Sequence, residues 1–66
     1  MRYGFIGLGN LGAFLAGSLV HDGFDVVVND LHPEAAADLI AKGADWADTP
    51  AAVAAVCDAV FTCLPS

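Results

Sequence analysis

Phe5-Ile6-Gly7-Leu8-Gly9-Asn10-Leu11-Gly12 is the stretch that decides the fold of this chain, because its three glycines have the spacing Gly-x-Gly-x-x-Gly. Apolar residues precede the glycines and a helical pattern follows them. In such a turn, Gly7 permits the tight change of direction after a strand. Gly9 lets the backbone approach a phosphate without an intervening Cβ, and Gly12 allows a helix to pack closely against a strand. The stretch therefore predicts a phosphate-binding loop, which we call the glycine loop (residues 7–12).

The start of the following helix supplies the donors that such a loop needs. The first N–H groups of a helix have no partner within the helix, and the helix dipole favours an anion at this end. We expect the N–H groups near Asn10 and Leu11 to point at the pyrophosphate of a dinucleotide. Leu8 lies between the first two glycines and belongs to the same candidate site.

The glycine spacing alone is weak evidence, since a glycine-rich structural turn without a ligand has the same pattern. Its surroundings make it specific. A plausible strand at 2–6 comes before the loop, a helical stretch at 10–21 comes after it, and an acidic residue, Asp30, ends the next apolar run. Asp30 lies 18 residues after Gly12, close to the separation of about 20 that is typical of dinucleotide-binding units. Together these features favour a dinucleotide site.

Length and composition indicate part of a larger protein. The chain has 66 residues, of which 58% are hydrophobic, and so short a domain buries only about 60% of its unfolded surface. No apolar run reaches the roughly 18–20 residues of a transmembrane helix. We therefore expect residues 1–66 to be the N-terminal part of a dinucleotide-binding domain. The rest of that domain would lie outside this sequence.

The charge balance excludes some partners. The formal net charge is −6, and Arg2 and Lys42 are the cations. Such a chain has no basic surface for nucleic acid or anionic lipid, so neither partner is expected. Backbone N–H groups, rather than a basic cluster, would have to hold any phosphates. This agrees with the interpretation of the glycine loop.

Cysteine and histidine usage predicts neither a disulfide nor a metal site. Cys57 and Cys63 lack Cys-x-x-Cys spacing, and we expect both to be reduced and partly buried. His21 and His32 stand on different predicted elements. Met1 is followed almost at once by a strand, so no targeting segment is expected, and the expected location is the cytoplasm, with the mitochondrial matrix as an alternative.

The remaining elements alternate as expected of a parallel α/β fold. After the strand at 2–6 and the helix at 10–21 come a strand at 25–29, a helix from Pro33 to Lys42, a short strand at 45–47, a helix at 50–56 and a strand at 59–64. Thr49 and Pro50 are a typical cap and first helical residue. We expect Leu11, Leu15, Leu19 and Phe14 to face the sheet.

This β-α-β-α-β-α-β order predicts part of a Rossmann-like, doubly wound parallel sheet with strand order 3-2-1-4. The cofactor crevice of such a sheet lies at the carboxyl ends of strands one and four, where the order reverses. The glycine loop and the segment Leu64-Pro65-Ser66 both emerge at that edge. They should flank one site.

The acid after the second strand bears on the choice of cofactor. A carboxylate at Asp30 would accept hydrogen bonds from the adenosine ribose and would repel a 2′-phosphate. Leu31 and His32 follow it, where an NADP enzyme would offer an arginine. NAD is therefore the expected cofactor. A turn or cap aspartate is the alternative for Asp30, and His32 is expected to lead into the next helix rather than to contact a phosphate.

Residues along the whole chain resemble the N-terminus of the β-hydroxyacid dehydrogenase family, which includes the 3-hydroxyisobutyrate dehydrogenases. The matching residues are Phe5 to Gly12, Leu15-Ala16, Leu19, Gly23, Val26 to Asp30, Pro33, Gly43-Ala44 and Cys57-Asp58 through Leu64-Pro65. The family commonly has methionine at Leu11 and asparagine at Ser18, two mild departures.

The resemblance implies hydride transfer between NAD and a small 3-hydroxy acid. It also implies a homo-oligomer at full length and a helical substrate and dimer domain outside this sequence. It implies that the loop holds the pyrophosphate, that Asp30 and Leu31 lie at the adenosine ribose, and that Leu64 and Pro65 line the nucleotide. The family's catalytic lysine lies beyond residue 66, so no catalytic residue is expected within 1–66, and Lys42 does not take that role. The segment alone should be inactive.

Two other functions fit the same scaffold. NADP-dependent imine or semialdehyde reductases resemble this family but tend to carry an Asn-Arg pair after the second strand, where this chain has Asn29-Asp30. A non-catalytic nucleotide-binding module would keep the fold without the chemistry, because fold alone does not fix function.

Overall fold

The computed structural model describes residues 1–63, and its elements alternate along the chain as the sequence predicts. In chain order they are β1 (Arg2–Ile6), α1 (Gly9–His21), β2 (Asp25–Asn29), η1 (Pro33–Ala36), α2 (Ala37–Ala41), β3 (Asp45–Trp46), α3 (Pro50–Val56) and β4 (Ala59–Thr62).

The strands form one parallel sheet in the order β3-β2-β1-β4, which confirms the predicted topology. At the carboxyl end of β1, Ile6 is level with Asn29 of β2 on one side and with Thr62 of β4 on the other. The segments that follow these three strands therefore leave the sheet side by side. This is the edge at which a ligand site was expected.

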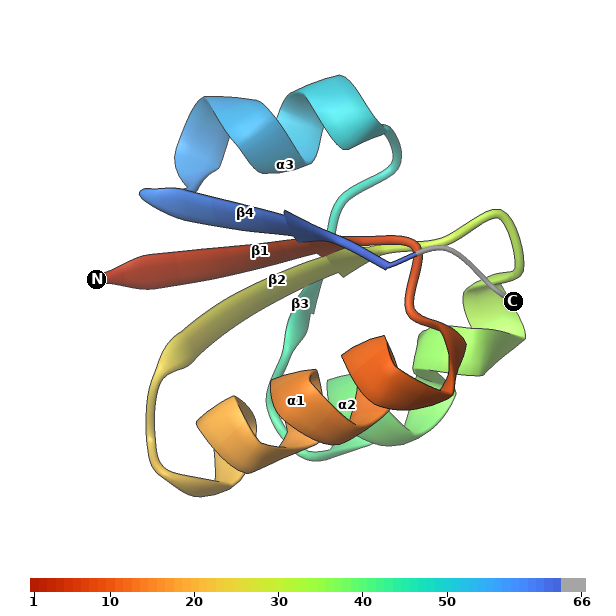
Figure 1. Ribbon diagram of the computed structural model, residues 1–66, viewed down its shortest axis with the longest axis vertical. Coiled ribbons are helices and arrows are strands. Elements are labelled where there is room, and N and C mark those ends of the chain that lie inside the picture. The colour runs from red at the N-terminus through yellow and green to blue at the C-terminus, as the bar shows by residue number, and fades with distance from the viewer. Residues whose placement is uncertain (64–66) are drawn as a thin grey trace.

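Helices cover both faces of the sheet (Figure 1). The helices α1 and α2 lie on one face and α3 lies on the other. Three consecutive valines of β2, Val26 to Val28, are all buried, as expected of a strand covered on both sides. Phe5 of β1 is also buried and stacks on Phe61 of β4.

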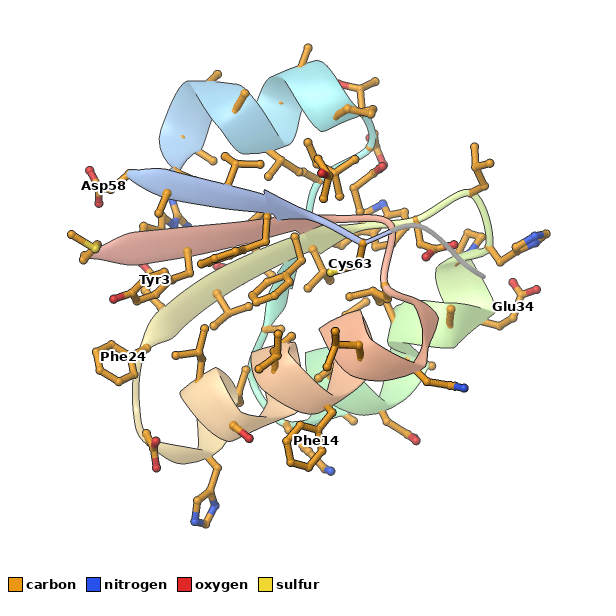
Figure 2. The ribbon with its side chains drawn as sticks, viewed as in Figure 1. Tyr3, Phe14, Phe24, Glu34, Asp58 and Cys63 are labelled. Carbon is orange, nitrogen blue, oxygen red and sulfur yellow. The ribbon has the colours of Figure 1, made fainter. Side chains whose placement is uncertain are left out.

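The prediction that the large apolar residues of α1 face the sheet is wrong for most of them. The buried residues of α1 are Gly12 and Ala16, whereas Leu11 and Phe14 are 68% and 70% exposed and Leu15 is 40% exposed. Figure 2 shows Phe14 pointing away from the sheet. Small residues let the helix axis approach the strands closely, so the larger apolar side chains on the neighbouring faces of α1 are left outside. Of the four predicted residues, only Leu19 packs against the core.

The predicted second helix is divided in two. Its first turn, η1, is a 3-10 helix with Pro33 at the start, and α2 adds only five residues before Lys42. The strands β3 and β4 are shorter than predicted. Cys63 still donates from its backbone N–H to the Ile6 carbonyl at 3.1 Å, so the β1–β4 pairing continues one residue past β4.

Two predicted helix ends are confirmed. Thr49 caps α3, because its Oγ1 accepts a hydrogen bond from the Ala52 N–H at 3.0 Å. The helix α1 ends at His21. Gly23, two residues later, has a φ of +87° and donates to the Val20 carbonyl, while Phe24 donates to the Leu19 carbonyl. Among residues 1–63, no helix combines the length and apolar character that a membrane crossing requires.

Candidate functional site

The glycine loop leaves β1 through a turn that requires glycine. Gly7 has a φ of +74°, and its N–H donates to the carbonyl of Asn29 at 2.9 Å. A Cβ at this position would lie 2.6 Å from the backbone oxygen of Cys63. The turn therefore tolerates no side chain, for conformational and for steric reasons, and the predicted role of Gly7 is confirmed.

Leu8 connects the loop to the neighbouring strand. Its N–H donates to Oδ2 of Asp30 at 2.8 Å, and its side chain is only 1% exposed. These contacts anchor the glycine loop to the end of β2 and to the core. The predicted contact of Leu8 with a cofactor stays a prediction.

The carboxylate of Asp30 lies beside the glycine loop. Its Oδ1 accepts a second hydrogen bond from the His32 N–H at 2.9 Å. These two backbone donors, His32 first and Leu8 second, lower the pKa of the Asp30 carboxyl, so it is ionised at neutral pH. The turn role that was the alternative for Asp30 is thus present. A carboxylate has about four acceptor positions, which leaves capacity for two hydroxyl donors.

The N-terminus of α1 opens at the same edge. The helix starts at Gly9, which has a φ of +56°, and Gly9, Asn10 and Leu11 are all exposed. Leu8 provides no side-chain cap for this end. The first N–H groups of an α-helix lack intrahelical acceptors, so those of Gly9 to Leu11 can donate to an anion held at the carboxyl edge of the sheet.

Gly12 packs against the residue that follows β4. A Cβ on Gly12 would lie 2.9 Å from both Cβ and Sγ of Cys63 and 3.4 Å from the carbonyl oxygen of Gly7. The expected close packing at Gly12 is therefore confirmed. Figure 2 shows Cys63 at the end of β4, on the side of the sheet that α1 covers. From its residue type alone, Cys63 is expected only to be a small, partly buried apolar residue. Its position directly after a strand that borders β1 is the sequence signal for its contact with the loop.

Asn29 is a second residue whose role was not predicted from the sequence. It is buried, and its Nδ2 donates to the Ala47 carbonyl at 2.7 Å while its own carbonyl receives the Gly7 N–H. It thus connects the glycine loop to the segment after β3. A polar residue directly after three buried valines is the sequence signal for such a role.

Both cations of the chain lie away from this edge. Arg2 is at the amino end of β1, where its guanidinium pairs with Asp25 and Asp45 at 3.1 Å. Lys42 follows α2 and lines a groove against α1 together with Phe14 and His21. The lysine is therefore remote from the candidate site, as predicted.

The structure describes some of the other predicted site residues and not others. Leu31 is 94% exposed directly after Asp30. His32 directly precedes η1, as expected of a residue leading into a helix. It is exposed, and its Nδ1 lies 3.8 Å from Oε1 of Glu34. Leu64 and Pro65 lie outside the described residues. Within residues 1–63, no three His, Cys, Asp or Glu side chains gather around a potential metal position, and Cys57 and Cys63 are free and partly buried.

Comparison with known proteins places these features in a family. Residues 2–66 match the family model described as the NAD binding domain of 6-phosphogluconate dehydrogenase. The chain is 38% identical to the mitochondrial 3-hydroxyisobutyrate dehydrogenase of Rattus norvegicus over 63 residues, which are 96% of this chain and 19% of that protein. It is 38% identical to 2-(hydroxymethyl)glutarate dehydrogenase of Eubacterium barkeri over 66 residues, covering 100% of this chain and 22% of that protein.

The backbone of this chain superposes on parts of larger proteins of known structure. An imine reductase from Pseudomonas sp. superposes with a TM-score of 0.91 at 28% identity, covering 96% of this chain and 22% of that one. Psf3 in complex with NADP+ and 2-OPP superposes with a TM-score of 0.90 at 34% identity, covering 97% of this chain and 22% of that one. The chain thus spans about a fifth of the length of these relatives. It belongs to the family of NAD(P)-binding, Rossmann-like domains of 6-phosphogluconate dehydrogenase, and its relatives include 3-hydroxyisobutyrate dehydrogenase and 2-(hydroxymethyl)glutarate dehydrogenase.

Proposed function

We propose that this chain binds NAD in preference to NADP, as the nucleotide-binding part of an oxidoreductase that acts on a small 3-hydroxy acid. The observation that carries the cofactor choice is the Asp30 carboxylate. It is ionised and lies against the glycine loop through its hydrogen bond with the Leu8 N–H. The donors for the pyrophosphate and the acceptor for the ribose are therefore neighbours.

The pyrophosphate would be held by main-chain groups. The N–H groups of Gly9 to Leu11 begin α1 at the carboxyl edge, and the dipole of this 13-residue helix favours an anion there. The Gly7 and Leu8 N–H groups already donate to Asn29 and Asp30. These contacts within the chain hold the loop in shape, which lowers the entropic cost of ordering it on binding.

The same carboxylate disfavours a 2′-phosphate. Asp30 would accept hydrogen bonds from ribose hydroxyls with its remaining lone pairs, whereas a phosphate at the 2′ position would bring a second anion next to it. Arg2 and Lys42 lie elsewhere and cannot compensate. At a partly exposed site we expect this repulsion to be worth at least about 1.4 kcal/mol, which is about tenfold in affinity.

The nicotinamide would supply the hydride acceptor for oxidation of a carbinol carbon. The relatives named 3-hydroxyisobutyrate dehydrogenase and 2-(hydroxymethyl)glutarate dehydrogenase support a short hydroxy acid as the substrate class. The residues that bind substrate and transfer its proton are proposed to lie outside residues 1–66. The part played by this segment is to hold the nucleotide and to orient it along the crevice.

Calorimetric titration of the intact protein with NAD and with NADP tests the cofactor proposal. We expect NAD to bind at least about tenfold more tightly. Equal or tighter binding of NADP would contradict it. A screen of short 3-hydroxy acids, followed at the absorbance of the reduced nicotinamide, then tests the substrate class. Binding of NAD without turnover of any hydroxy acid would instead favour a non-catalytic nucleotide-binding module.

An NADP-linked reductase is the second candidate, and its support is structural. The backbone superposes on an imine reductase and on a protein whose structure holds NADP+. Such proteins share the glycine-loop architecture, so the residue after β2 has to discriminate between the two functions. Asp30 at that position favours NAD.

A further inference from the structure

Cys63 lies against the glycine loop from the β4 side. Its backbone oxygen lies 2.6 Å from the position of a Cβ on Gly7, and its Cβ and Sγ each lie 2.9 Å from the position of a Cβ on Gly12. The hydrogen bond from the Cys63 N–H to the Ile6 carbonyl fixes this residue to the sheet. Cys63 is therefore a rigid contact for the loop and for the first turn of α1.

The opposite side of the loop is held by hydrogen bonds. Gly7 donates to the Asn29 carbonyl and Leu8 donates to the Asp30 carboxylate, both at the end of β2. The loop is thus bounded by polar contacts toward β2 and by van der Waals contact with Cys63 toward β4. The size of the side chain at position 63 limits how closely the start of α1 approaches the sheet.

We propose that Cys63 is a positioning residue for dinucleotide binding, because its side-chain volume sets the place of the α1 N-terminus and hence of the pyrophosphate donors. This inference rests on the proposed function. Charge-assisted N–H···O hydrogen bonds have lengths of about 2.7–2.9 Å, so a displacement of several tenths of an ångström weakens them. A larger residue at 63 would push Gly12 away and carry the neighbouring N–H groups with it.

Cys57 provides a matched control in the same chain. It also lies against a glycine, since a Cβ on Gly4 would be 2.8 Å from the Cys57 Sγ. Cys57 follows α3 and precedes β4, at the amino edge of the sheet and away from the glycine loop. Burial raises the pKa of its thiol. Enlarging Cys57 should therefore disturb packing to a similar degree without moving the nucleotide site.

The first experiment compares Cys63→Leu with Cys57→Leu in the intact protein, and it measures both the Tm and the Kd for NAD. We expect both variants to lower the Tm, whereas only Cys63→Leu weakens NAD binding, by about tenfold or more. Equal losses of NAD affinity in the two variants would overturn the inference. Failure of the unchanged protein to bind NAD or NADP would overturn the proposed function, and this inference with it.

A second experiment uses rescue and does not need a large residue to fold. Gly12→Ala places a methyl group against Cys63, and Cys63→Gly removes the two nearest atoms, which leaves the Gly7 carbonyl oxygen at 3.4 Å. We expect Gly12→Ala to weaken NAD binding and the double variant to recover most of the affinity. Recovery would show coupling between the two positions. Strictly additive losses would overturn the proposal, even if Cys63→Leu does not fold.

Discussion

The carboxylate of Asp30 accepts a hydrogen bond from the backbone N–H of Leu8 at 2.8 Å, across 22 positions of the sequence. This contact joins the end of β2 to the glycine loop that follows β1. The residue proposed to recognise the ribose is therefore also a residue that fixes the pyrophosphate loop. Changes at Asp30 should affect both stability and nucleotide choice.

Asp30→Asn should lower stability in a pH-dependent way. The folded-state pKa of this carboxyl is lower than its ordinary value of about 3.9, so the ionised form stabilises the fold above that value. That stabilisation is lost as the pH falls through the folded pKa. For a partly exposed group we expect the variant to be about 1 kcal/mol less stable at pH 7. Urea unfolding from pH 7 down to pH 3 should show the difference shrinking below about pH 4.

Asp22→Asn is the control for this experiment. Asp22 is exposed at the end of α1, and surface substitutions of this kind usually change stability by less than about 0.5 kcal/mol. A pH-dependent loss of the same size in both variants would show that the two backbone hydrogen bonds of Asp30 contribute nothing specific.

Asp30→Arg should change the nucleotide preference toward NADP. The substitution removes an anion and adds a guanidinium beside the position of the 2′-phosphate. Both nucleotides should bind less tightly than NAD binds the unchanged protein, because the loop contact with Leu8 is lost. The ratio of Kd for NADP to Kd for NAD should fall by about a hundredfold. Leu31→Arg, which adds the same cation but keeps the carboxylate, should change this ratio much less.

Two glycines of α1 should respond oppositely to alanine. Gly12→Ala forces a contact of 2.9 Å with Cys63 and should cost about 1–3 kcal/mol of stability. Gly17→Ala meets its nearest atom, Leu39 Cδ2, at an ordinary 3.7 Å and gains helix propensity of up to about 1 kcal/mol. Thermal unfolding of the two variants checks this. A loss at Gly17 as large as that at Gly12 would contradict the close approach at Cys63.

Thr49→Ala should destabilise the fold by about 1 kcal/mol, because the first turn of α3 loses the side-chain acceptor of the Ala52 N–H and keeps only the Thr49 carbonyl as its acceptor. Thr49→Ser keeps the hydroxyl and is the matched control. Because α3 lies on the face opposite α1, neither variant should change the Kd for NAD in excess of its stability effect. An unchanged Tm in Thr49→Ala would show that this cap is not needed.

The sequence predicts the fold well because the β/α alternation is strong and each element carries its own local signal. Prolines start two helical segments, Gly23 ends α1, and the all-valine run marks a strand buried on both faces. Asp30 and the glycines are recognised through spacing, a property of the chain itself. Their placement at one edge follows from parallel topology.

The contacts across the sheet could not be predicted from that pattern. The helix α1 buries Gly12 and Ala16 rather than its leucines, because the close approach at Gly12 decides which face turns inward. Apolar periodicity cannot identify the buried face of a helix that carries large apolar residues on several of its own faces. The contact of Cys63 with the loop, and that of Asn29 with Ala47, join distant segments. Neither residue has a local sequence signal strong enough to reveal its partner.

Amide chemical shifts of the isotopically labelled intact protein, followed during a titration with NAD, test the central claim most directly. The account predicts that the largest changes occur at the N–H groups of Gly9 to Gly12 and at Asp30 and Leu31. Small changes are expected at the groove between α1 and the end of α2, where Phe14, His21 and Lys42 lie. Changes concentrated in that groove, with the glycine loop unaffected, would contradict the account.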